Sequence, residues 1–237
     1  TDKTTALVYN NYQNPISAAS SQDEMEALAD LAIEHDLWVL SDDAYYEIRY
    51  TDEPPRSIVN IPGMKERTVI LYTFSKKFAM TGWRVGASIG PSEVINQIAR
   101  FNINDESCTN HFIQHALAET VGGDSSGANE LSSELQARRD ETIKGLNAID
   151  GIHVPTPEST FYSYPNVSTV MANKGFTDLD KFRTSALEAT GVSFCARHHF
   201  GTPLADETDH YIRLAYSGIN QNDIREGLAK LKSWIEG

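Results

Sequence analysis

The first half of the chain alternates between continuous apolar runs and a run with helical spacing. The continuous runs predict strands over residues 4–10, 37–43, 67–75 and 85–90. Ser21-Gln22-Asp23-Glu24 has the form of a capping box, and the apolar residues after it predict a helix that ends near His35. Because the strands are apolar throughout, we expect a mostly parallel sheet that is covered on both faces.

The pattern changes in the second half of the chain. One helical region is predicted from Pro91 to about Thr120, and the Gly- and Ser-rich residues 121–129 form the clearest break. The further predicted helices cover 130–149, 177–190 and 220–235, the last one capped by Asn220 or Asn222, and the short strands cover 152–154, 160–164, 192–195 and 210–216. The prediction is therefore an α/β chain, with part of a large domain at 1–125 and a smaller α+β domain at 126–237.

Composition narrows the classes of partner. The 237 residues carry a formal net charge of −13, which argues against nucleic acid and anionic membranes, because both require basic surface. No apolar run approaches the roughly 20 residues that a membrane helix needs. The two cysteines, Cys108 and Cys195, form no disulfide framework, so a reducing cytoplasm is the expected compartment.

Polar side chains gather where the predicted strands end. They are Asn14, Asp42 with Tyr45, the group Thr73, Ser75 and Lys76, and Arg84 at the start of the next strand. Ligands of open α/β sheets bind at the carboxyl ends of the strands. This combination of groups suits a ligand that has an anionic phosphate, a basic ring nitrogen, a phenolate-like oxygen and an aldehyde.

Three segments carry a family resemblance, namely SDDAYYE at 41–47, TFSKKFAMTGWRVG at 73–86 and YIRLAYS at 211–217. They resemble fold-type I pyridoxal phosphate enzymes, specifically class I/II aminotransferases of the aspartate aminotransferase kind. The family pattern Ser-x-Ser-Lys-x-x-x-x-x-Gly-x-Arg matches at 73–84, with Thr73 in place of the first serine. The resemblance implies a pyridoxal 5'-phosphate-dependent aminotransferase that acts on an amino acid and a 2-oxo acid.

The resemblance assigns roles around the central motif. Lys76 matches the lysine that forms the Schiff base with the cofactor aldehyde and acts as general base and acid, whereas Lys77 matches a neighbour without a catalytic role. Arg84 matches the arginine that clamps the phosphate, and a structural salt bridge is its alternative. Thr73 and Ser75 are predicted to add hydroxyl donors to the phosphate, with structural turn hydroxyls as the alternative.

Four more positions match family residues. Asp42 matches the carboxylate that pairs with the pyridine nitrogen. Tyr45 matches the phenol at the cofactor 3'-oxygen, with Tyr46 as the alternative. Asn14 matches the amide at the same oxygen, with a simple turn asparagine as the alternative. Arg213 matches the arginine that binds the substrate α-carboxylate, with a buried ion pair as the alternative.

The sequence also departs from the family pattern. Ala196-Arg197 stands where Pro-Gly is usual, and Ser159-Thr160 stands where Gly-Ala is common. Both departures lie near the expected substrate side and leave the substrate open, with Arg197 as a candidate cation for an acidic substrate. Family members are much longer, so we expect an N-terminal segment of the same protein to carry the phosphate loop and the ring-stacking aromatic. A homodimer is also expected.

Two alternative functions and two further candidate sites stand beside this assignment. A β-lyase that acts on sulfur amino acids would use the same scaffold, and a regulator with an aminotransferase-like domain is the second alternative. His111 and His115 have helical i, i+4 spacing, but no acidic partner accompanies them, so no metal site is predicted. Cys195 is expected to be a small core residue.

Overall fold

The structure is a computed structural model that describes residues 1–124 and 126–237. The chain forms two compact units. Unit 1 comprises residues 1–12 and 18–131, and unit 2 comprises residues 13–17 and 132–237. The short segment 13–17 therefore belongs with the second half of the chain. The division between residues 125 and 126 that the sequence suggested stays a prediction.

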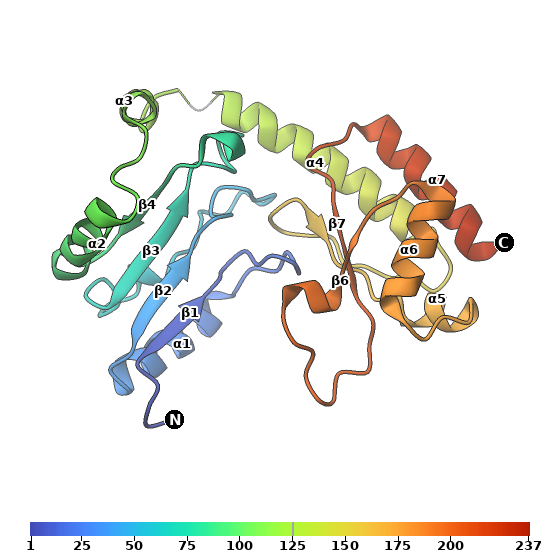
Figure 1. The fold of residues 1–237 in the computed structure, drawn as a ribbon, viewed down its shortest axis with the longest axis horizontal. Helices are drawn as coiled ribbons and strands as arrows, with labels where there is room; N and C mark the ends of the chain where they lie inside the picture. The colour runs from blue at the N-terminus through green and yellow to red at the C-terminus, as the bar shows by residue number, and fades with distance from the viewer. Residues whose placement is uncertain (125) are drawn as a thin grey trace. The chain divides into compact units, whose positions relative to one another are not determined.

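Unit 1 is built on one four-stranded sheet with the order β1-β2-β3-β4 (Figure 1). Its strands are β1 (Ala6–Tyr9), β2 (Trp38–Asp42), β3 (Thr68–Thr73) and β4 (Gly86–Ile89). The first three strands run parallel, as expected, but β4 is antiparallel to β3. The sheet is therefore mixed. The 12 residues that join β3 to β4 contain only the short 3-10 helix η2 (Thr81–Trp83), and not the α-helical crossover that usually joins parallel neighbours.

One face of this sheet is packed against helix α1 (Gln22–Glu34), which lies behind β1 and β2 in Figure 1. The predicted capping box is confirmed, because the Ser21 side chain accepts from Glu24 N and the Glu24 side chain accepts from Ser21 N. Buried Met25, Ala29 and Ala32 of α1 pack with the strand residues and with the short 3-10 helix η1 (Ile58–Asn60). This packing buries one face of β1 and β2.

The expectation of a sheet covered on both faces is wrong for the described residues. Val8 and Leu71 point away from the face that packs on α1, and Val8 is 70% exposed. The predicted helical region at 91–120 is two helices, α2 (Ser92–Asn104) and α3 (His111–Thr120). The polar residues 105–110 separate them, and Ser107 adopts a positive φ of 62°, which a continuous helix excludes.

The second half of the chain contains seven elements after the long helix α4 (Ser126–Leu146). They are β5 (Tyr162–Ser163), α5 (Ser168–Asn173), α6 (Leu179–Thr190), β6 (Cys195–Ala196), the 3-10 helix η3 (Arg197–Phe200), β7 (Ile212–Ala215) and α7 (Gln221–Glu236). The predicted strand at 152–154 is absent, although these residues are buried in part. Helix α4 begins four residues before its predicted start, where Asp124 accepts hydrogen bonds from the Ser126 backbone and hydroxyl.

Unit 2 has a small antiparallel sheet with the order β5-β7-β6 and a single large core. Helices α6 and α7 contribute Phe182, Leu228 and Leu231 to this core. Asn220 caps α7 by accepting from Asp223 N at 2.9 Å, which decides between the two predicted caps. Among the described residues, no helix combines the length and the apolar character that crossing a bilayer requires.

Candidate functional site

Six of the predicted site residues lie in unit 1 near the carboxyl ends of β2 and β3. We call them the strand-end cluster: Asp42, Tyr45, Thr73, Ser75, Lys76 and Arg84. Asp42 is the last residue of β2 and pairs in register with Leu71 of β3, two residues before Thr73. The parallel pairing thus brings the two strand ends together, as the sequence predicted.

Asp42 and its neighbour Asp43 have different surroundings. Asp42 is half-buried, and its Oδ1 accepts from Ala44 N at 3.2 Å. Asp43 is buried, and it accepts from the Ser41 hydroxyl at 2.7 Å and from the Ser57 hydroxyl at 3.4 Å. Burial raises the pKa of Asp43, and the two hydroxyl donors oppose this rise only in part. Asp42 is therefore the more accessible of the two carboxylates at this strand end.

The two adjacent lysines are used differently. Lys77 Nζ forms an ion pair with Glu47 Oε1 at 2.7 Å, and Tyr72 donates its hydroxyl to the other oxygen of Glu47, also at 2.7 Å. Lys76 lies in the strand-end cluster, with its Nζ 5.6 Å from the ring centroid of buried Tyr45. Only Lys76 is therefore placed beside the other residues that the family pattern selects.

The hydroxyls that were predicted to bind phosphate form one compact group. Thr73 Oγ1 donates to Ser75 Oγ at 2.9 Å, and Ser75 N donates to Thr73 Oγ1 at 3.2 Å. Phe74 N donates to Val85 O at 3.3 Å, so the residue after Arg84 lies beside this turn. Arg84 adopts a left-handed conformation with φ 52° after the 3-10 helix η2 (Thr81–Trp83), and its Nη1 donates to Thr81 O at 3.0 Å.

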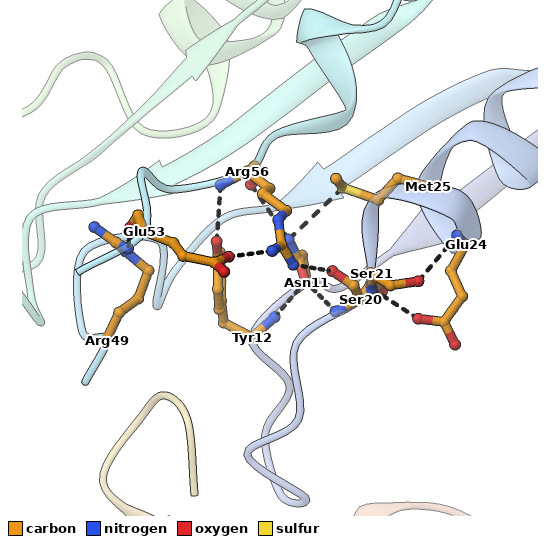
Figure 2. A network of polar contacts seen from close by, with 9 residues as sticks. All are labelled: Asn11, Tyr12, Ser20, Ser21, Glu24, Met25, Arg49, Glu53 and Arg56. Carbon is orange, nitrogen blue, oxygen red and sulfur yellow. Dashed lines mark hydrogen bonds and ion pairs between the residues drawn. The ribbon is translucent and has the colours of Figure 1, made fainter. Parts of the chain in front are cut away.

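A second set of contacts fixes the carboxyl end of β1, next to the cluster (Figure 2). Buried Asn11 accepts from Tyr12 N at 3.0 Å and from Ser20 N at 2.9 Å, and it donates to Arg56 O at 3.2 Å. Arg56 forms an ion pair with Glu53. The preceding residue, Asn10, donates to the carbonyl of Asp42 at 2.9 Å, so the end of β1 supports the end of β2.

The other two predicted residues, Asn14 and Arg213, lie together in unit 2. Arg213 of β7 donates from Nη1 to Asn14 Oδ1 at 2.7 Å. Its Nη2 lies 3.6 Å from Cys195 Sγ, and its Nε is buried without a hydrogen-bond partner among the described residues. No carboxylate of the described chain forms an ion pair with Arg213. The alternative of a buried ion pair is therefore not what the structure contains.

The surroundings of Arg213 include residues that the sequence did not single out. The guanidinium carbon lies 4.3 Å from the ring centroid of Tyr162 and 4.6 Å from that of Phe200. Cys195, expected in the core, is instead half-buried beside the guanidinium. These contacts join residues far apart in the chain, and no periodic pattern marks them. Arg197, the candidate cation for an acidic substrate, is held by Glu207 in a two-point ion pair at 2.7 and 2.9 Å.

Comparison with known proteins leads to the same family that the sequence motifs resemble. The family model of class I and II aminotransferases matches residues 1–231. The asparagine–oxo-acid transaminase of Streptococcus mutans is 31% identical over 238 residues, which cover 100% of this chain and 58% of the relative. The aspartate aminotransferase of Musicola paradisiaca is 34% identical over 218 residues, which cover 92% of this chain and 52% of the relative.

A solved structure gives the same result for the fold. The aromatic aminotransferase from Pyrococcus horikoshii matches with a TM-score of 0.90 and 32% identity, over 100% of this chain and 61% of that one. The chain therefore spans just over half the length of the curated relatives that it matches. The expected α/β fold, as part of a fold-type I domain followed by an α+β region, agrees with this structure.

Proposed function

We propose that this chain, which belongs to the family of class I and II aminotransferases, carries cofactor-binding and substrate-binding residues of an enzyme that transfers an amino group from an amino acid to a 2-oxo acid. The activity belongs to the full-length protein, since the chain spans just over half of its relatives.

The strand-end cluster fits pyridoxal 5'-phosphate, the cofactor that members of this family use. When bound, the cofactor supplies an electron-poor ring that stabilises negative charge at the substrate Cα. Asp42 would accept a hydrogen bond from the ring nitrogen and keep it protonated, and Tyr45 would donate to the 3'-oxygen. Thr73, Ser75 and Arg84 would bind the phosphate, because hydroxyls and a guanidinium are donors that suit it.

Lys76 would hold the cofactor and then move a proton at the substrate. Its amine lies at the same strand ends as Asp42 and the hydroxyl pair, and a flexible four-carbon stem lets it move between the two tasks. With the cofactor in place, Lys76 Nζ would act as the general base that removes the proton from the substrate Cα and as the acid that returns it. Lys77 has no part in this step, because Glu47 binds its amine.

Arg213 would bind the α-carboxylate that amino acids and 2-oxo acids share. A half-buried guanidinium without a carboxylate partner in the described chain is electrostatically suited to a bound anion. Asn14 accepts from Arg213 through Oδ1, so its Nδ2 is the group that would donate to the cofactor 3'-oxygen. Fixing the carboxylate orients the Cα–H bond for proton transfer.

We also propose a further segment of the same protein, a second subunit and two substrates as partners of this chain. A further segment of the same protein would cover the exposed apolar side chains of unit 1, including Val8 and Leu71. A homodimer and a cytoplasmic location follow the family resemblance and the two free cysteines. Amino acid and 2-oxo acid are the expected substrate classes, and the ion pair of Arg197 with Glu207 gives no support to Arg197 as a second carboxylate site.

The observation that carries the proposal is the different use of the two lysines. Borohydride reduction of the full-length protein with bound cofactor, followed by peptide mapping, should place the adduct on Lys76. The variant Lys77→Met should retain both the adduct and turnover, whereas Lys76→Ala should lose at least about a hundredfold in kcat, the lower end of what a positioned base contributes. An adduct on Lys77 would overturn the assignment.

Assays of the same full-length protein distinguish the aminotransferase from the β-lyase and the regulator. Turnover that requires a 2-oxo acid supports amino-group transfer. Ammonia release from cysteine conjugates without a 2-oxo acid would indicate the β-lyase, and the absence of any cofactor adduct would favour the regulator.

A further inference from the structure

Two aromatic rings pack against the guanidinium of Arg213. The ring of Tyr162 in β5 lies 4.3 Å from the guanidinium carbon, and the ring of Phe200, the last residue of η3, lies 4.6 Å from it. Both distances are within the range in which a cation is attracted to an aromatic face. Tyr162 is buried, so this cation is in contact with aromatic surface in a partly desolvated setting.

The edge of the same guanidinium is only partly used by the described residues. Asn14 accepts from Nη1 at 2.7 Å, and Cys195 Sγ, a weak acceptor, lies 3.6 Å from Nη2. A guanidinium has five N–H donors, so further donors point away from these two contacts. The two rings thus lie against the guanidinium, and its buried Nε has no hydrogen-bond partner among the described residues, which suits the group to a planar anion.

Phe200 is held in place by the anchoring of η3. Arg197 forms its two-point ion pair with Glu207, and Ala196 N donates to His199 Nδ1 at 3.2 Å. His198 Nε2 lies 3.2 Å from Asp180 Oδ2 at the start of α6. Because the Nδ1 lone pair of His199 accepts a backbone N–H, this histidine acts as a hydrogen-bonded anchor of the turn. The turn that carries Phe200 is therefore fixed by these ion pairs and hydrogen bonds, and this holds the ring of Phe200 against Arg213.

We infer that Phe200 is a positioning residue that, together with Tyr162, fixes the plane of the Arg213 guanidinium so that its available edge meets the substrate α-carboxylate. This inference rests on the proposed function of Arg213. An arginine side chain has many rotamers, and binding is weakened by the entropy lost when they are restricted. Holding the group in advance between two rings, which are not hydrogen-bond acceptors of the ordinary kind, reduces that loss without using its N–H donors.

The test compares Phe200→Leu with the wild-type full-length holoenzyme. KM for the amino acid and KM for the 2-oxo acid should both rise by about three- to thirtyfold, the range that corresponds to losing one cation–π contact, with kcat within about threefold. An amine analogue without the α-carboxylate should show no such loss in kcat/KM. Phe200→Tyr keeps the ring and should restore both KM values.

Phe176→Leu is the matched control, because it also removes a ring from unit 2 but one that packs against Phe182 and Trp234. It should lower Tm without raising KM. If Phe200→Leu does not fold, Phe200→Met removes the ring with a flexible apolar side chain and gives the same comparison.

The outcomes also separate this inference from the proposed function. If Arg213→Lys leaves KM unchanged, the role of Arg213 itself fails. If Arg213→Lys raises KM while Phe200→Leu behaves like Phe176→Leu, or lowers kcat alone, the carboxylate site stands and the positioning role of Phe200 is overturned.

Discussion

Lys76 and Lys77 show how neighbouring residues of one type acquire different roles. The turn after β3 directs Lys77 to Glu47, whose second oxygen is bound by the Tyr72 hydroxyl. Burial, with the hydrogen bond to Glu47 as a smaller cause, raises the pKa of Tyr72, so this phenol stays a neutral donor at neutral pH. Lys77 thus helps to hold the turn, and Lys76 is left at the strand ends beside Tyr45.

Asp42 and Asp43 divide in a similar way. An ionised carboxylate is costly to bury, and Asp43 has only the hydroxyls of Ser41 and Ser57 as side-chain donors within the described residues. Asp42 lies nearby and also disfavours the ionised form of Asp43. The raised pKa of Asp43 is therefore a property of the fold that can be measured.

We expect Asp43→Asn to change how stability depends on pH. Because the folded-state pKa of Asp43 is raised, its protonated form stabilises the fold fully below the unfolded pKa of about 3.9, and this contribution is lost as pH rises through the folded pKa. The free energy of unfolding of Asp43→Asn minus that of the wild type should therefore increase with pH over this window and then level off. Urea unfolding at a series of pH values measures it.

Glu24→Gln is a control for which we expect the opposite dependence of the stability difference on pH. Hydrogen bonds from Ser21 lower the pKa of Glu24, so its contribution to the wild type is present above the unfolded pKa and is lost as pH falls. A difference between Asp43→Asn and wild type that does not vary with pH would contradict the assigned shift.

At the scale of elements, the hairpin of β3 and β4 carries the central motif. Thr73 pairs with Gly86, and the turn between them contains Lys76 and Arg84. A Cβ atom added at Gly86 would lie 2.7 Å from the backbone oxygen of Tyr72, closer than real Cβ atoms approach. A Cβ atom added at Gly82, in η2, would meet no atom within 4 Å among the described residues. Gly86 therefore has no room for a Cβ atom, whereas Gly82 does.

Gly86→Ala should destabilise the protein by about 1–3 kcal/mol, because the strands must move apart to accept the methyl group. Gly82→Ala, the matched change in open space, should alter the free energy of unfolding by no more than about 0.5 kcal/mol. Urea unfolding of both variants tests the comparison. Equal losses in the two variants would show that the close approach of β3 and β4 is relieved without cost.

The corrections to the predicted elements share one cause. The sequence predicts one helical region where the structure has α2 and α3, and a helix over most of α4, but local contacts decide where the helices begin and end. The positive φ of Ser107 and the polar run around it divide α2 from α3, and Asp124 extends α4 toward the break. Such boundaries depend on single hydrogen bonds and dihedral angles, which apolar spacing does not encode.

At the scale of the whole molecule, unit 1 exposes more apolar surface than an isolated unit normally does. Val8 and Leu71 are exposed on the sheet, and Phe101 and Ile103 are exposed on α2, with Phe101 at 74%. The relatives are longer than this chain, which makes a further segment of the same protein the expected cover.

We expect the 237-residue chain on its own to bind the hydrophobic dye ANS and to self-associate, because exposed apolar surface drives both. The full-length protein should bind little dye and form one defined oligomer. Dye fluorescence and sedimentation at several protein concentrations make the comparison. Phe101→Ser should reduce association of the isolated chain, and a monomeric 237-residue chain without dye binding would contradict the proposed cover.

The sequence by itself determined the family, the fold class and the identity of the residues in the central motif. It did so because a motif of fixed spacing, such as Lys76 to Arg84, is a local property of the chain. The hydrophobic pattern was sufficient for the four strands of unit 1 and for α1, because burial of apolar side chains is what forms them.

Only the tertiary structure decided which residues surround each charged group. The antiparallel pairing of β4, the ion pair of Lys77 with Glu47, and the rings of Tyr162 and Phe200 against Arg213 each join positions by distance in space. Arg213 and Asn14 are 199 positions apart in the chain, yet they share a hydrogen bond of 2.7 Å. Such contacts follow from how the elements pack, and one sequence without its fold does not specify that packing.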